Sequence, residues 1–141
     1  MKPASTRAGK ARATVGKRDY ERLSDFRHRL RQFLRNSELL CKRFGLTALQ
    51  YQLLLHVMGF PERSWATVSE LAQRLQAHHH GVVALVDRCA ELGLLERRPG
   101  REDQRVVEIH LLEKGERVLE ELVALHKGEH RALLKEFGAT P

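Results

Sequence analysis

The chain has 141 residues, 42% of them hydrophobic and only four of them proline, which predicts one globular domain and excludes a disordered or low-complexity protein. No apolar run approaches the ~20 residues that a membrane-spanning helix needs, and no apolar segment follows the basic N-terminus as it would in a secretory signal. We therefore expect a cytoplasmic protein with no membrane partner. The net charge of +7 favours phosphate-rich partners, but five of the excess basic residues lie within the first 17 positions, so charge alone is weak evidence.

The N-terminal part is predicted to be a basic tail followed by one long helix. Residues 1–16 carry almost no bulky apolar side chains and are expected to be disordered, either simply solvated or serving as an arm that contacts DNA. From 18 to 44, apolar residues recur at spacings of three and four, which predicts an amphipathic helix. Gly45 interrupts this pattern, and Thr47 is a typical N-cap for a second helix that ends near Gly59.

Two short helices are predicted in the centre of the chain. Thr67 and Glu70 form the S/T-x-x-E pattern of a capping box, in which each side chain accepts a hydrogen bond from the other residue's backbone N–H. The helix that they begin has an apolar stripe at i, i+3, i+4 and i+7, formed by Val68, Leu71, Ala72 and Leu75. After a turn at 76–78, a second helix is predicted over about 78–92, and Gly93 is typical of its C-terminal end. Its apolar stripe consists of Val82, Leu85, Val86 and Cys89.

A β-hairpin is predicted to follow these helices. The strands are expected at 94–98 and 105–111, and the second of them alternates apolar and polar residues with the period of a half-buried strand. A charged turn at 99–104 joins them, and Trp65-Ala66 has the composition of a minimal third strand. The order helix, turn, helix, wing predicts a winged helix-turn-helix, a mostly α fold with a small β-wing (α+β), which places its second helix in a DNA groove.

Two terminal helical segments, 18–44 and 113–137, flank this lobe of residues 46–112. Both carry wide apolar faces, and Gly128 is a candidate break within the second. A single copy would expose an unusually large apolar area, so we expect a homodimer in which these dimerisation helices of two copies interlock. The alternative is that they pack only on their own lobe. We expect residues 17–141 to form a single domain that includes both dimerisation helices and the lobe. A two-fold dimer of this domain would suit a palindromic DNA site.

The lobe and its flanking helices together resemble the MarR family of bacterial transcription regulators. The matching segments, in the family's order and spacing, are LTALQYQLLLHV (46–57), TVSELAQRL (67–75), VVALVDRCAELGLLER (82–97), DQR (103–105) and LLEKG (111–115). The resemblance covers about residues 18–137. It implies a winged-helix homodimer, expected to be a repressor that binds a pseudo-palindromic operator in double-stranded DNA and is released by a small-molecule effector or by oxidation.

The second central helix is expected to read the major groove with residues near its N-terminus. Candidates for contact with base edges or phosphates are His78, His79 and His80. Val83 and Ala84 are candidates for contact with a thymine methyl group, and Arg88 is expected to contact a phosphate or to pair with a neighbouring acid. The MarR family usually has Ser or Thr where this chain has the histidine run, so the role of the helix transfers more safely than any single contact.

The hairpin is expected to carry arginines to the DNA. Its basic residues are Arg97, Arg98, Arg101 and Arg105. Arg101, at the tip, is the candidate for insertion into the narrow, electronegative minor groove. Asp103 and Arg105 resemble the family's paired wing residues, so we expect Asp103 to orient an arginine through a salt bridge and Arg105 to contact the DNA backbone. The alternative is a solvated hairpin with alternating charges.

Effector and redox sites are only weakly indicated. In the MarR family, small molecules bind between the dimerisation helices and the DNA-binding lobe, and candidates for such a site are Tyr51, His56 and Phe60, although core packing explains them equally well. Cys41 precedes Lys42 and Arg43, whose charges would lower the pKa of its thiol, which makes it a candidate redox switch. Cys89 lies in an apolar stripe and is expected to be an inert core residue.

No metal, cofactor or catalytic site is predicted. Consecutive helical residues diverge by about 100°, so the histidine run 78–80 cannot converge on one ion. His126 and His130 are spaced i, i+4 and could chelate, but we expect them on an exposed polar face. The chain has no nucleophile–base constellation, phosphate loop or paired carboxylates that would indicate an enzyme. The alternative functions are therefore a redox- or metal-responsive regulator of the same fold and a winged-helix adaptor that binds a protein partner.

Overall fold

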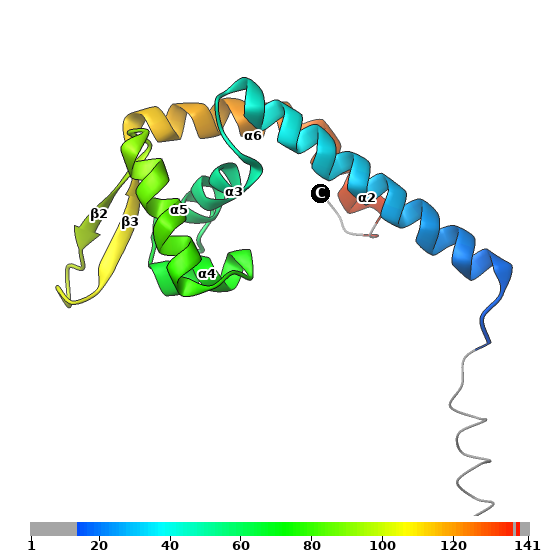
Figure 1. Ribbon diagram of the computed structural model, residues 1–141, viewed down its shortest axis with the longest axis horizontal. Coiled ribbons are helices and arrows are strands. Elements are labelled where there is room, and N and C mark those ends of the chain that lie inside the picture. Colours follow the sequence, from blue (N-terminus) through cyan, green and yellow to red (C-terminus); the bar gives the residue numbers. More distant parts are fainter. Residues whose placement is uncertain (1–13, 137, 139–141) are drawn as a thin grey trace, which may run out of the picture. The chain divides into compact units, whose positions relative to one another are not determined.

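The computed structural model describes residues 14–136 and residue 138. Most of the predicted basic tail, residues 1–13, lies outside this range, and residues 14–16 are exposed. The chain divides into two units, the first ending at Leu34 and the second beginning at Arg35. Helix α2 (Lys17–Arg43) begins in the first unit, and all later elements belong to the second (Figure 1).

The first unit presents apolar side chains to solvent. Tyr20 and Leu23 of α2 are 63% and 64% exposed. Large apolar side chains at this exposure are costly to leave in water over a wide area. The predicted helix at 18–44 is confirmed within one residue at each end, and its apolar residues remain available for a partner.

The second unit is a winged helix-turn-helix with a long C-terminal helix, which confirms the predicted fold class. In chain order its elements after α2 are α3 (Ala48–Met58), β1 (Trp65–Ala66), α4 (Val68–Leu75), α5 (His79–Glu91), β2 (Leu95–Pro99), β3 (Val107–Leu111) and α6 (Glu113–Glu136). Helix α3 lies at the centre and contacts α4, α5, α6, β1 and β3. No helix in the described part of the chain is both long and apolar enough to cross a membrane.

The core forms around the buried face of α3. Leu53, Leu54 and Val57 of this helix have no exposed surface. Val86 from α5 and Ile109 from β3 are equally buried and belong to the same apolar cluster. Each such side chain contributes roughly 1.5–3 kcal/mol through its removal from water. The elements that carry the wing and the second central helix are therefore fixed to one common core.

Two capping boxes define where α3 and α4 begin. Thr67 accepts a hydrogen bond from the Glu70 N–H at 3.3 Å, and the Glu70 carboxylate accepts one from the Thr67 N–H at 2.9 Å, as predicted. Thr47 and Gln50 form a second box at the start of α3, with distances of 3.1 and 2.9 Å. The N-cap role predicted for Thr47 is thus confirmed.

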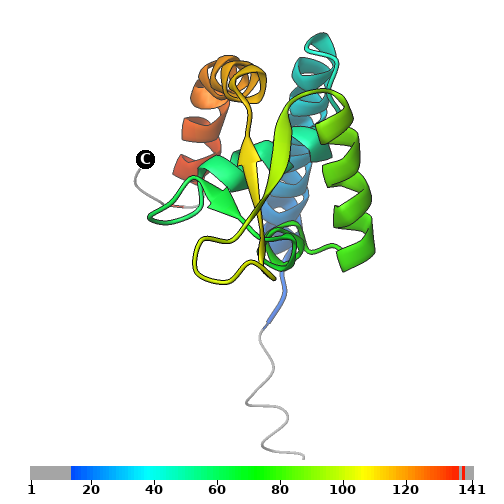
Figure 2. The same cartoon turned by 90° about the vertical axis from the view of Figure 1, so that its left-hand side faces the viewer.

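The wing is a three-stranded antiparallel sheet with the order β1-β3-β2. The minimal strand at Trp65–Ala66 is confirmed, and Trp65 pairs with His110. Gly93 has a φ of +73°, which lets the chain turn from the end of α5 into β2, as predicted for this position. Figure 2 shows β2 and β3 as a hairpin, with the loop that joins them at its lower end.

One predicted element boundary is wrong. Helix α6 runs without interruption from Glu113 to Glu136, through Gly128, where a break was a candidate. A single glycine weakens a helix by only about 1 kcal/mol. The backbone around it remains helical because the apolar residues before it, such as Leu119 and Leu122, are buried in the core.

Candidate nucleic-acid interface

Helix α5 presents a polar edge beside a buried one. Its stripe residues Val82, Val86 and Cys89 are at most 1% exposed, and the remaining side chains of the first turns point outward. The exposed candidates for DNA contact are His78, His79, His80, Ala84 and Arg88. Val83 is half-buried, and His78 occupies the N-cap position without a side-chain capping hydrogen bond. The sequence-based division of this helix into an inner and an outer face agrees with the burial of its residues.

A groove of about 480 Å³ runs between the start of α4, the first turns of α5 and the hairpin. It is lined by Thr67, Val68, Ser69, His79, Val83, Arg97, Arg105, Val106 and Val107. Two arginines, one histidine and the first turn of a helix therefore face one concave surface. Guanidinium groups and the N–H groups of a helix N-terminus both favour phosphate oxygens. The groove combines residues from three elements that the sequence analysis treated separately.

Salt bridges fix the arginines of the wing. Asp103 accepts hydrogen bonds from the side chain of Arg105 at 3.1 and 3.2 Å and from its N–H at 3.0 Å, so the predicted pair is present. These bonds from Arg105 lower the pKa of the Asp103 carboxyl group below its usual value. Arg97 pairs with Asp87 of α5 at 2.6 Å, which ties the wing to the helix beside it. Arg101 is exposed at the tip.

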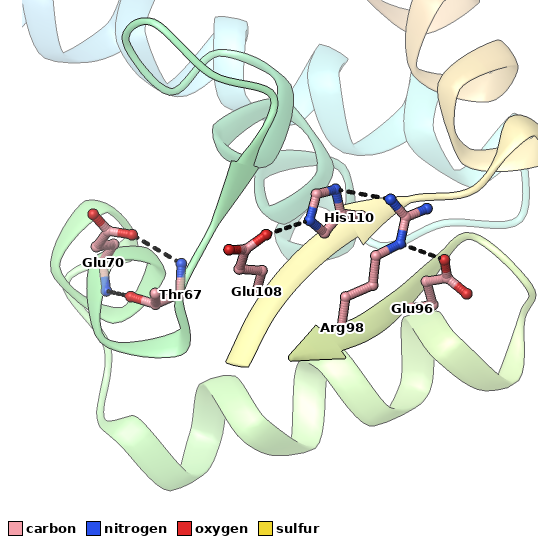
Figure 3. Close-up of polar contacts among 6 residues, drawn as sticks. All are labelled: Thr67, Glu70, Glu96, Arg98, Glu108 and His110. Carbon is pink, nitrogen blue, oxygen red and sulfur yellow. Dashed lines mark hydrogen bonds and ion pairs between the residues drawn. The ribbon is translucent and has the colours of Figure 1, made fainter. Parts of the chain in front are cut away.

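Arg98 and Arg88 differ from the other candidates. The Arg98 Nε lies 2.6 Å from a carboxylate oxygen of Glu96, and both side chains belong to the outer face of the sheet (Figure 3). Arg88 was expected to contact phosphate or to pair with an acid. The acidic neighbour on its own helix, Asp87, pairs with Arg97 instead. Arg88 itself is exposed, so phosphate contact remains a prediction for this residue.

Residues 44–106 match the family model described as the MarR family. Half of the chain also resembles a curated protein, the uncharacterized HTH-type transcriptional regulator YsmB of Bacillus subtilis (strain 168). The two are 32% identical over 71 residues, which are 50% of this chain and 49% of that protein. This central part of the chain is therefore similar to the MarR family. The match spans about half the length of this curated relative.

Solved structures of MarR-family proteins share the fold over most of the chain. AbsC, a MarR family transcriptional regulator from Streptomyces coelicolor, has a TM-score of 0.73 at 17% identity, with 89% of this chain and 84% of AbsC covered. A MarR family protein from Bacillus stearothermophilus has a TM-score of 0.71 at 25% identity, covering 88% and 85%. A mutant MarR from E. coli complexed with operator DNA has a TM-score of 0.65 at 23% identity, covering 81% and 79%.

The effector candidates His56 and Phe60 share Arg74 as a neighbour, whereas Tyr51 packs against His126. Tyr51 is 3% exposed, and its ring stacks on His126 at 4.7 Å between centroids. Burial raises the pKa of Tyr51 to about 12, and its hydroxyl has no hydrogen-bond partner in the described part of the chain. Phe60 instead lies 4.1 Å beneath the guanidinium of Arg63. Burial, together with the charge of Arg74, lowers the pKa of His56. A ligand site shared by Tyr51, His56 and Phe60 therefore stays a prediction.

The expectation that neighbouring charges lower the pKa of the Cys41 thiol is wrong, and a redox role for this residue stays a prediction. The side chain has no exposed surface, and burial raises the pKa of its thiol despite a hydrogen bond with Ser37. The charges of Lys42 and Arg43 do not offset this effect because both side chains are exposed and directed to solvent. Cys89 is equally buried, and burial raises its pKa to about 11, as expected for an inert core cysteine.

Sequence reasoning missed the role of His126. It was expected on an exposed polar face with His130, but it has no exposed surface. Its Nδ1 donates to the Leu122 carbonyl at 2.6 Å, and its Nε2 lies 2.9 Å from the Ser37 hydroxyl oxygen. The helical spacing could have predicted its burial. His126 follows Leu119 by seven residues and Leu122 by four, so it continues their buried stripe.

Proposed function

We propose that this chain is a homodimeric transcription regulator that binds a pseudo-palindromic operator, with α5 in the major groove and the wing tip in the minor groove. The observation that carries the proposal is the groove shared by α4, α5 and the hairpin, with Arg97, Arg105 and His79 on one concave surface. A DNA backbone supplies regularly spaced phosphates to such a surface. The similarity to YsmB by sequence, and to E. coli MarR in complex with operator DNA by fold, supports the same assignment.

Contacts with individual bases follow from the exposed edge of α5. His79 and His80 are the candidates for hydrogen bonds to base edges, and Ala84 is the candidate for contact with a thymine methyl group. His78 precedes them at the N-cap, and Arg88 lies further along the same exposed side. Arg101 would enter the minor groove from the hairpin tip, where a narrow groove concentrates negative potential.

A dimer is proposed because apolar residues of both terminal helices remain uncovered. Tyr20 and Leu23 of α2 are more than half exposed, and Leu125 and Leu134 of α6 are 47% and 40% exposed. Burying such surface against a second copy would contribute roughly 25 cal/mol for each Å² removed from water. Two copies would also present two copies of α5 to successive half-sites. Sedimentation of the purified protein as a monomer at micromolar concentration would contradict this part of the proposal.

The decisive experiment measures binding to DNA fragments from the protein's own promoter and to random DNA of equal length. We expect a preference for the promoter fragment and an affinity that falls steeply with salt, because bound cationic side chains release counterions. Arg101→Ala should weaken binding about tenfold or more without changing the melting temperature. Arg43→Ala removes the same charge from an exposed position at the end of α2 and serves as the control.

The outcomes separate the competing functions. Equal affinity for promoter and random DNA would contradict sequence-specific regulation. Absence of DNA binding altogether would favour the adaptor alternative, in which the basic wing meets an acidic protein. If Arg101→Ala and Arg43→Ala weaken binding equally, the loss reflects net charge, and the minor-groove contact assigned to Arg101 is wrong. Release by a small effector would appear as a ligand-dependent loss of the promoter complex.

A further inference from the structure

A second cavity lies on the side of the sheet that faces away from the core. It has a volume of about 380 Å³ and is lined by Trp65, Gly100, Arg101, Glu102, Asp103, Val106 and Glu108. These residues come from β1, from the hairpin loop and from β3. Small-molecule sites in proteins typically have volumes of about 300–1,000 Å³. This cavity is large enough for a small organic molecule, and the lining of the DNA-facing groove shares only Val106 with it.

Glu108, in the wall of this cavity, is a buried carboxylate paired with His110. The residue is only 5% exposed, and one of its oxygens lies 2.8 Å from Nε2 of His110 (Figure 3). The other ring nitrogen of His110, Nδ1, lies 3.4 Å from Nη1 of Arg98. His110 therefore lies between Glu108 and Arg98, with one ring nitrogen beside each side chain.

The other charges around the cavity cancel in pairs. Arg98 is paired with Glu96 at 2.6 Å, and Arg105 is paired with Asp103 at 3.1 Å. Arg101 and Glu102 are adjacent, exposed and of opposite sign. Arg63, which covers the ring of Trp65, is bonded to Glu70. Glu108 has no arginine or lysine partner among the described residues, so its buried carboxylate favours a cation in the cavity.

The walls of the cavity are held in place by contacts of their own. The Arg63 guanidinium lies 3.9 Å from the centre of the Trp65 ring and so limits its movement. The hairpin loop closes through a hydrogen bond of 2.7 Å from the Gly100 N–H to the Val106 carbonyl. A Cβ at Gly100 would lie 2.5 Å from the Asp103 carbonyl oxygen, so this loop conformation requires glycine. The cavity thus has an aromatic wall, an aliphatic wall and a fixed loop as its rim.

We propose that this cavity binds a small organic cation. The ammonium or guanidinium group of the ligand pairs with Glu108, and an apolar body of about the size of one ring packs against Trp65 and Val106. Because Arg101 belongs to the rim, an occupant holds the hairpin tip in one position and changes its contact with DNA. This regulatory consequence rests on the proposed function, whereas binding of the cation does not.

The test uses Trp65, the single tryptophan of the chain, as an internal reporter in the full-length protein without DNA. The probes are phenethylamine, the neutral 2-phenylethanol and the anion 3-phenylpropionate, which share a phenyl ring and differ in charge. We expect a saturable change in Trp65 fluorescence with phenethylamine, at a dissociation constant of about 0.1–1 mM for a ligand of this size. The alcohol and the anion should bind at least tenfold more weakly.

Two variants test whether the charge of Glu108 is responsible for binding of the amine. Glu108→Gln keeps the shape of the side chain and removes its charge, and should weaken the amine at least tenfold. Glu91→Gln removes one exposed negative charge at the end of α5 and should leave the dissociation constant within about twofold, as expected for a screened surface charge. Equal binding of the three probes, no saturable signal, or unchanged amine affinity in Glu108→Gln would overturn the proposal. If Glu108→Gln does not fold, the comparison of the three probes on the unsubstituted protein still decides.

The two proposals can fail separately. Amine binding without any DNA binding would leave the cation site standing and remove the proposed function. Specific DNA binding without amine binding would do the reverse. A change of the promoter affinity by phenethylamine that is absent in Glu108→Gln would support both proposals together.

Discussion

The buried hydrogen bond between Ser37 and His126 should be one of the most strongly coupled side-chain pairs in the protein. It joins α2 to α6 within the second unit, and neither residue is more than 8% exposed. Nδ1 of His126 donates to the Leu122 carbonyl, and Nε2 forms the hydrogen bond with the Ser37 hydroxyl. We expect His126→Phe to preserve the ring that stacks on Tyr51 and to remove both hydrogen bonds.

The loss of stability in each variant depends on whether the substitution leaves a buried polar group without a hydrogen-bond partner. A neutral hydrogen bond contributes about 1 kcal/mol to stability, and a buried polar group without a partner costs about 1–3 kcal/mol. His126→Phe should therefore lower the free energy of unfolding by about 2–4 kcal/mol, and Ser37→Ala by about 1–3 kcal/mol, because each strands the other partner. The double variant strands neither. We expect it to be more stable than the sum of the single effects predicts, by at least about 1 kcal/mol.

The assay is urea unfolding at neutral pH, followed by circular dichroism and by Trp65 fluorescence at one fixed protein concentration. Any cost of fitting phenylalanine into the site is common to the single and double variants and cancels in the cycle. Ser24→Ala, at an exposed position on α2, is the control that should show no coupling to His126→Phe. Additivity within about 0.5 kcal/mol for Ser37 and His126 would refute the assigned hydrogen bond.

Two further predictions concern the start of α4 and the stability of the protein at acidic pH. Thr67→Ala should destabilise the protein by about 1 kcal/mol, because the N-terminus of α4 loses its cap. Ser69→Ala in the same turn is the control and should change stability by less than about 0.5 kcal/mol. Equal effects of the two substitutions in thermal melts would contradict the capping role of Thr67. Burial and the charge of Arg74 lower the pKa of His56 below its ordinary value of 6.5, so the unfolded chain binds the proton first as the pH falls. The free energy of unfolding should therefore decline below about pH 6.5, and this decline should be smaller in His56→Asn. The measurement is the urea midpoint between about pH 6.5 and 5. An equal decline of the midpoint in both proteins would contradict the role of His56.

The sequence predicted those parts of the fold that local rules decide. The capping box at Thr67, the apolar stripe of α5 and the turn at Gly93 each depend on residues within one or two helical turns. The pairing of Asp103 with Arg105 was likewise predictable, because the two residues are neighbours in one loop. These features position α4, α5 and the wing, so the sequence was sufficient to place the elements that form the candidate interface.

Features that depend on contacts between distant elements were not predictable in the same way. Cys41 was assessed from its charged neighbours in the sequence, but its pKa is raised because α2 is buried there. His126 was treated as a polar surface residue, although its partner Ser37 lies 89 positions earlier. In both cases the polar or reactive side chain continues a buried helical stripe. Periodicity indicated burial more reliably than residue type did.

Strand β3 shows how the wing can connect two sites. Its alternating sequence predicted one buried and one solvated face, and Ile109 is buried in the core as expected. Glu108, on the opposite face, is nevertheless only 5% exposed, because Trp65 and the hairpin loop cover it. Val106, just before this strand, lines both the outer cavity and the groove between α4, α5 and the hairpin. A ligand in the cavity and a phosphate in the groove would therefore contact the same segment, so that binding at either site should alter the position of the hairpin tip at the other.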